Sequence, residues 1–162
     1  MKHENLVVVL FTVAAVLITG YIFANSIQSS EGSHERSEQI SEQLQEIVRP
    51  DNVNRNSEEW DIFVRKAVHG LEFAGLGICA GGFFIHLSKK RRRRYVSAAL
   101  FTVLSVAVAD EYIQSFTNRS SEEGDIVIDF IGGCFGLLII VFADRFAKWM
   151  ILRRRKHSVS NS

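Results

Sequence analysis

The sequence has few prolines, few cysteines and almost no net charge. Its single proline, Pro50, excludes a proline-rich linker or recognition tract. Two cysteines in 162 residues are too few for a disulfide scaffold. The chain has 19 Lys and Arg residues against 18 Asp and Glu residues, a formal net charge of +1, whereas a nucleic-acid-binding protein is basic over a whole face. We therefore expect no nucleic-acid partner.

Long apolar runs are present instead. Leu6–Ala24 has 19 residues and no charge, while a hydrocarbon core of about 30 Å requires roughly 20 apolar residues in a helix. A soluble helix of this length would have a polar face, which argues against a soluble helical bundle. The sequence therefore predicts an all-α, polytopic membrane protein, a bundle of four transmembrane helices. The other three spans are Ala67–Leu87, Tyr95–Gln114 and Ile126–Ala143.

The first span is predicted to be a retained anchor. A cleaved signal peptide ending near Ala24 is the alternative, but the apolar region of such a peptide usually has only about 7–15 residues. The rest of the chain divides where its composition changes. We expect an N-terminal transmembrane helix at 1–24, an extracytoplasmic polar loop at 25–60 with a short amphipathic helix within 33–48, a three-helix domain at 61–144 and a basic cytoplasmic tail at 145–162.

Basic residues next to the spans predict their orientation, because the cytoplasmic loops of membrane proteins carry an excess of Lys and Arg. Lys89–Arg94, with the sequence KKRRRR, lies between the second and third spans. Arg153–Lys156 lies after the fourth span, two crossings further along the chain. Both runs place the N-terminus and the C-terminus inside the cell, and the loops 25–66 and 115–125 outside.

Several charged residues lie within the spans, where charged groups are costly and usually functional. At a rise of about 1.5 Å per residue, Glu72 lies about 8 Å, Asp110 about 6 Å and Asp129 about 5 Å inside the outer boundary of the membrane. Any one of these groups alone could be structural, and His69 could be an interfacial histidine. Their common level predicts an acidic pocket, open to the outside, that includes Arg65, His69, Glu72, Asp110, Glu111, Gln114, Asp125 and Asp129.

Small residues continue two of these polar faces into the membrane, and small residues let helix backbones approach closely. The glycines that follow Glu72 and Asp129 are predicted to pack spans two, three and four together. They are Gly75, Gly82, Gly132 and Gly136. Another pair, Gly77–Gly81, lies on the opposite face of its helix and suits either the first helix or a partner chain.

The order and spacing of these residues resemble the VanZ-like family of small bacterial membrane proteins. The resemblance covers residues 61 to about 143 and rests on the blocks Arg65-Lys66-x-x-His69-x-x-Glu72-Phe73, Asp110-Glu111-x-x-Gln114, Arg119 and Asp125-x-x-x-Asp129-x-x-Gly132. It implies a multi-pass protein of the bacterial cell membrane, in a family named for low-level resistance to the glycopeptide teicoplanin. It also adds Lys66 and Arg119 to the candidate pocket.

Three functions are compatible with such a pocket. The leading hypothesis is a cell-envelope protein that binds, or modulates access of, a lipid headgroup, a lipid-linked cell-wall precursor or an amphiphilic antibiotic. In it the basic residues at the rim face phosphate or carboxylate groups; they are Arg65, Lys66 and Arg119. The second is an intramembrane enzyme that acts on a lipid-linked substrate by acid–base chemistry. Its divalent metal, if it uses one, would bind His69, Glu72, Asp110 and Asp129. The third is a proton-coupled transporter, although transport sites lie nearer the midplane.

The leading hypothesis requires no cofactor. The lipid bilayer is the partner that follows directly from the apolar spans, and the number of chains in the assembly is left open.

Overall fold

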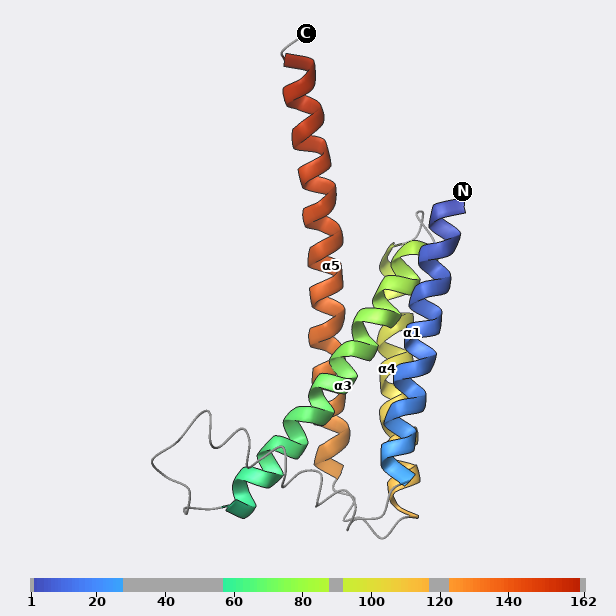
Figure 1. Ribbon diagram of the computed structural model, residues 1–162, viewed down its shortest axis with the longest axis vertical. Helices are drawn as coiled ribbons and strands as arrows, with labels where there is room; N and C mark the ends of the chain where they lie inside the picture. Colours follow the sequence, from blue (N-terminus) through green and yellow to red (C-terminus); the bar gives the residue numbers. More distant parts are fainter. Residues whose placement is uncertain (1, 28–56, 88–91, 117–122, 161–162) are drawn as a thin grey trace.

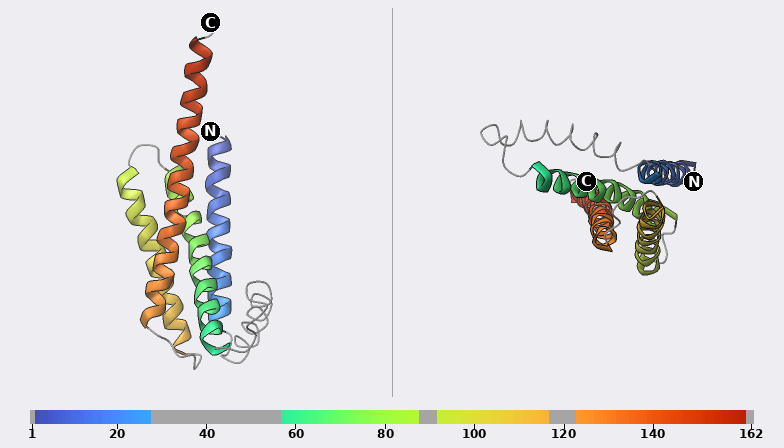
Figure 2. Two further views of the ribbon diagram at one scale, coloured as in Figure 1. Left: turned by 90° about the vertical axis from the view of Figure 1, so that its left-hand side faces the viewer. Right: turned by 90° about the horizontal axis from the view of Figure 1, so that it is seen from below.

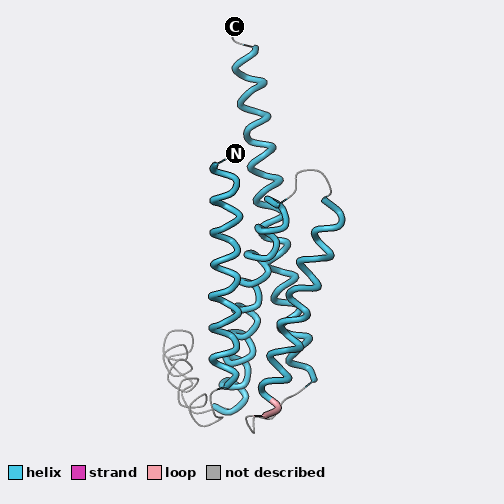
Figure 3. The backbone as a smooth tube through the Cα atoms, turned by 90° about the vertical axis from the view of Figure 1, so that its right-hand side faces the viewer, coloured by secondary structure: helices cyan, strands magenta, loops and turns pink. Residues whose placement is uncertain are grey.

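The computed structural model describes residues 2–27, 57–87, 92–116 and 123–160. These residues are helical apart from a turn at Ser115 and Phe116 (Figure 3). Arg119 and the amphipathic helix predicted within 33–48 lie outside the described residues. The helices within the described residues are α1 (Lys2–Ile27), α3 (Ser57–Leu87), α4 (Arg92–Gln114) and α5 (Glu123–Ser160), labelled in Figure 1.

All four of the described helices are long and apolar enough to cross a membrane, which confirms the predicted all-α, four-helix membrane architecture. The described parts of these spans expose large apolar side chains, as lipid-facing helices do. On α1, for example, Val16 is 66% and Leu17 is 68% exposed. The spans are Asn5–Ile27, Ile62–Leu87, Val96–Gln114 and Gly124–Arg154.

Helix α3 is the centre of the bundle and packs against each of the other three helices. It crosses the bundle at a steep tilt, while α1 and α4 lie side by side along one part of it and α5 along another (Figures 1 and 2). The two ends of the chain lie at the same end of the bundle (Figure 1). This agrees with an even number of crossings, and the assignment of that end to the cytoplasm stays a prediction from the basic residues.

Helices α3 and α5 pack almost backbone to backbone. A Cβ atom at Gly132 would collide with the carbonyl oxygen of Gly70, and a Cβ atom at Gly136 with that of Ala74. From the side of α3, a Cβ atom at Gly77 would collide with the carbonyl oxygen of Gly133 on α5. Glycines of both helices therefore permit this approach, as small residues do in membrane bundles.

The two small-residue faces of α3 serve different neighbours. A Cβ atom at Gly75 would contact Ile18 of α1. A Cβ atom at Gly82 would collide with the ring of Phe11, which also belongs to α1. Both glycines thus pack against the first helix, whereas the sequence placed them at the contact with spans three and four. From the sequence, the Gly77–Gly81 pair was expected to contact either the first helix or a partner chain. In the structure it packs against α5.

A buried apolar cluster joins α1, α3 and α4 just beneath the polar residues of the spans. Ile22, Phe73 and Val103 are fully buried within it, and Leu76 and Ala107 complete it. Ile22 comes from α1, so the first helix is part of the core. Its last turn is therefore held against α3 and α4, beside the candidate pocket.

Helix α5 extends well beyond the other three helices at the end where the chain termini lie (Figure 1). Its 38 residues span about 57 Å, nearly twice the hydrocarbon thickness of about 30 Å. The segment predicted as a basic tail at 145–162 thus continues the helix as far as Ser160. Arg153 lies over the ring of Trp149 at 5.3 Å from its centroid, a pairing that suits a membrane interface.

Candidate functional site

Polar side chains from all four helices meet near the end of the bundle opposite the chain termini, where α1 and α4 end and α5 begins. We call this group the polar cluster. It consists of Ser26 of α1, His69 of α3, Asp110 and Gln114 of α4, and Asp129 of α5. All except His69 are buried, and the His69 side chain is 18% exposed.

Asp110 is held from two helices. The residue is fully buried, and its Oδ1 accepts a hydrogen bond from the Ser26 hydroxyl. Its Oδ2 accepts a hydrogen bond of 2.7 Å from Nε2 of Gln114, one turn further along α4. The same Nε2 lies 3.4 Å from Oγ of Ser26, so the three side chains form one network. This network fixes the direction of the Asp110 carboxylate.

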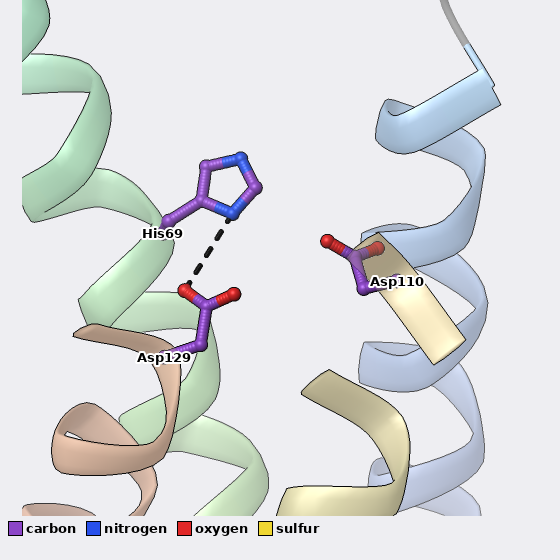
Figure 4. Close-up of side chains that lie close together, drawn as sticks. All are labelled: His69, Asp110 and Asp129. Atoms are coloured by element: carbon purple, nitrogen blue, oxygen red, sulfur yellow. Dashed lines mark ion pairs between the residues drawn. The ribbon is translucent and has the colours of Figure 1, made fainter. Parts of the chain in front are cut away.

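Asp129 faces His69 and Asp110 across the interior of the bundle (Figure 4). Its Oδ1 lies 3.8 Å from Nδ1 of His69, and the residue is only 3% exposed. One nitrogen or oxygen atom from each of the three residues lies within 4.8 Å of the other two. Two carboxylates this close in a low-dielectric interior repel one another, so the arrangement calls for a positive charge beside them.

The surroundings of the polar cluster contain further charged residues that the sequence singled out. Lys66 and Asp125 form an ion pair of 3.3 Å between α3 and α5, with side chains 28% and 23% exposed. Glu72 turns towards α1, where its Oε1 accepts a hydrogen bond of 3.4 Å from Nδ2 of Asn25. Arg65 and Glu111 are half-buried.

The structure thus brings together His69, Asp110, Gln114 and Asp129, with Lys66 and Asp125 as a neighbouring pair. The sequence predicted a pocket open to the outside, but the two central carboxylates are almost completely buried. The reason is that α1 packs against α4 and brings its Ser26 hydroxyl onto Asp110.

Asn25 and Ser26 of α1 were not among the pocket residues predicted from the sequence. They follow the apolar run Leu6–Ala24 directly and look like the polar flank of a membrane anchor. One available signal was the spacing of Ser26 four residues after Ile22, which places both on one helical face. Whether that face met the polar cluster depended on how α1 docks.

Replacing Ser26 with alanine should remove the link between α1 and Asp110. Because a buried acceptor then loses its donor, we expect the free energy of unfolding to fall by about 1–3 kcal/mol. The measurement is denaturant-induced unfolding of the purified protein in detergent. Ser115→Ala is the matched control, since the Ser115 hydroxyl is exposed and bonds Tyr112 O. Equal stability of the two variants would contradict the observed network.

Comparison with known families supplies the identification. A model of the VanZ/LLP1 family matches residues 11–144, which is most of the chain. The chain belongs to the VanZ/LLP1 family. The match confirms the resemblance read from the charged blocks, and it extends that resemblance to include most of α1. No match was found among curated proteins or among solved structures.

All five residues of the polar cluster lie within the part matched by the VanZ/LLP1 model. The matched part also contains the glycines at which α3 and α5 approach each other. The last sixteen residues of α5, after position 144, lie outside it. The family unit in this chain is therefore the four-helix bundle with the polar cluster inside it.

Proposed function

We propose that this VanZ/LLP1 family membrane protein acts in the bacterial cell envelope by binding an amphiphilic ligand at the polar cluster. The observation that carries the proposal is the convergence of polar side chains from four helices in a membrane bundle, all of them buried except His69. Such groups are expensive to bury, and those inside a membrane usually serve binding, transport or catalysis. Packing alone would be served better by apolar side chains of similar size.

The ligand class follows from the chemistry near the cluster. The exposed apolar side chains of the helices suit contact with an acyl or polyprenyl chain in the bilayer, and the partly exposed Lys66 suits a phosphate or carboxylate group. A lipid-linked cell-wall precursor and a teicoplanin-type glycopeptide both combine an apolar chain with a polar, anionic part. We propose that the ligand is of this class and that its polar part reaches the bundle beside Lys66 and Asp125.

An intramembrane enzyme acting on a lipid-linked substrate is the second candidate. The close approach of His69 to Asp129 favours it, because an imidazole beside a carboxylate can accept and return a proton. A transporter is less well supported. Asp110 lies only one turn from the end of α4, whereas transport sites lie near the middle of the membrane.

The test is growth of a teicoplanin-sensitive bacterium that expresses the chain, at protein levels matched by immunoblot of membranes. We expect expression to raise the inhibitory teicoplanin concentration and Asp110→Ala or Asp129→Ala to abolish the increase. The purified variants should bind teicoplanin or the lipid-linked precursor at least about tenfold more weakly, a loss of about 1.4 kcal/mol.

Asp144→Ala is the control, because Asp144 pairs with Lys148 on the part of α5 away from the polar cluster. Full resistance and unchanged binding of both ligands by the Asp110 and Asp129 variants would overturn the proposal. Binding of the precursor without teicoplanin, or the reverse, would identify the ligand. Turnover of the bound precursor would favour the enzyme.

A further inference from the structure

We propose that His69, Asp110 and Asp129 bind one divalent transition-metal ion, with Zn²⁺ and Mn²⁺ as the best matched metals. These three residues come from α3, α4 and α5, and each presents one ligand atom to a common point. The inference does not depend on the identity of the amphiphilic ligand proposed above.

The spacing is close to that of a metal site. The three ligand atoms lie within 4.8 Å of one another. In a tetrahedral zinc site with bonds of about 2.1 Å, the ligand atoms are about 3.4 Å apart. Because Ser26 and Gln114 hold the Asp110 carboxylate, rotation of the Asp129 carboxylate about its side-chain bonds is the adjustment that would bring the ligand atoms closer.

Asp129 provides an independent indication of a ligand. It is 3% exposed, yet within the part of the chain that the structure describes its Oδ1 has no hydrogen-bond partner. Nδ1 of His69, at 3.8 Å from this oxygen, is beyond hydrogen-bond distance. Figure 4 shows that this carboxylate is aimed at the space between His69 and Asp110. A buried acceptor with this orientation is poised to bind a cation.

Charge balance also supports a divalent ion. Two carboxylates beside a neutral imidazole carry a charge of −2, which a divalent cation cancels. An imidazolium alone would leave one negative charge buried in the bundle, at a cost of several kcal/mol. The site has the outer hydrogen bonds typical of metal ligands, because Ser26 and Gln114 orient the Asp110 carboxylate.

The ligand set indicates which metals fit. One imidazole nitrogen with two carboxylate oxygens suits the borderline ion Zn²⁺, and also Mn²⁺ through its preference for carboxylate oxygen, whereas Mg²⁺ and Ca²⁺ prefer oxygen ligands only. Three protein ligands also leave a coordination position open, as in catalytic zinc sites. A phosphate or carboxylate oxygen, or water, is the natural occupant of that position.

The experiment uses the full chain, purified in detergent with an affinity tag that contains no histidine. After treatment with a chelator, the protein is equilibrated with Zn²⁺ or Mn²⁺ and dialysed, and the metal is measured by mass spectrometry. Titration calorimetry then gives the affinity. We expect about one ion per chain, and at least a tenfold weaker affinity in Asp129→Asn and His69→Gln.

Asp144→Asn serves as the control, because it removes a carboxylate of α5 that pairs with Lys148 instead. A second measurement does not depend on whether the variants fold. The unfolding temperature of the unaltered chain should rise with metal concentration. The proposal is overturned if the unaltered chain retains no metal and shows no such rise, or if Asp129→Asn binds as tightly as Asp144→Asn. Teicoplanin binding by a metal-free chain would separate this failure from that of the proposed function.

Discussion

Replacing Gly136 with alanine should destabilise the bundle by about 3 kcal/mol or more, because the added methyl group meets the backbone of α3. Its carbon would lie 2.7 Å from the carbonyl carbon of Ala74 and closer still to the carbonyl oxygen. A flexible side chain could move aside, but a helical carbonyl group cannot do so without separating the helices. The contact between α3 and α5, which also positions His69 against Asp129, should therefore be lost.

The measurement is reversible unfolding in mixed micelles, with Gly20→Ala as the matched control. Gly20 lies on α1 with nothing within 4 Å of the place where a Cβ atom would be. There the substitution should be neutral or stabilising by up to about 1 kcal/mol, since alanine has a higher helix propensity than glycine. If both variants unfold at the same denaturant concentration, the close approach of α3 and α5 is incorrect.

Replacing His69 with leucine should be the most damaging change within the polar cluster. The imidazole is the member of this cluster that can carry a positive charge, and it lies beside Asp129 with Asp110 opposite (Figure 4). Without it, two buried carboxylates face each other, and an uncompensated buried charge costs about 3–5 kcal/mol. The loss is measured by unfolding in detergent with a chelator present, so that bound metal does not contribute.

A double-mutant cycle separates this charge effect from lost packing. Asp129→Asn removes one negative charge at almost constant volume, so it should recover about 1–3 kcal/mol in the His69→Leu background. The matched cycle is Lys148→Leu with Asp144→Asn on the same helix α5, where the Lys148 side chain is 57% exposed. Coupling there should stay below about 1 kcal/mol. A His69–Asp129 coupling as small as this would show that the polar cluster is not electrostatically linked.

The charged residues illustrate how far a sequence pattern can predict a site in this protein. Spacing along the chain places Asp110 and Gln114 on one helical face, and their hydrogen bond follows directly. Spacing also puts His69 and Glu72 within one stripe of α3. In the structure these two residues separate, His69 towards Asp129 and Glu72 towards Asn25 of α1. The spacing of residues along one helix cannot make this distinction, because it does not show which other helices pack against each face.

The glycines show the same limit. That α3 would approach its neighbours closely was evident from its two small-residue faces. The sequence did not show which face meets α1 and which meets α5, because both faces offer small side chains and the charge of Glu72 on one of them does not identify the neighbouring helix. In the structure Gly77 meets Gly133 of α5 and Gly82 meets Phe11 of α1, because α3 packs against both of these helices with opposite faces.

The sequence by itself determined the four apolar helices, the family and the level of the polar residues. These properties depend on the length and spacing of residue types along one helix, which hydrophobicity and helical geometry control. Only the tertiary structure decided that α1 supplies Ser26 to Asp110, that the central carboxylates are buried, and that His69 and Asp129 lie side by side with Asp110 opposite. These contacts join residues up to 84 positions apart, and they depend on how the surfaces of helices interlock.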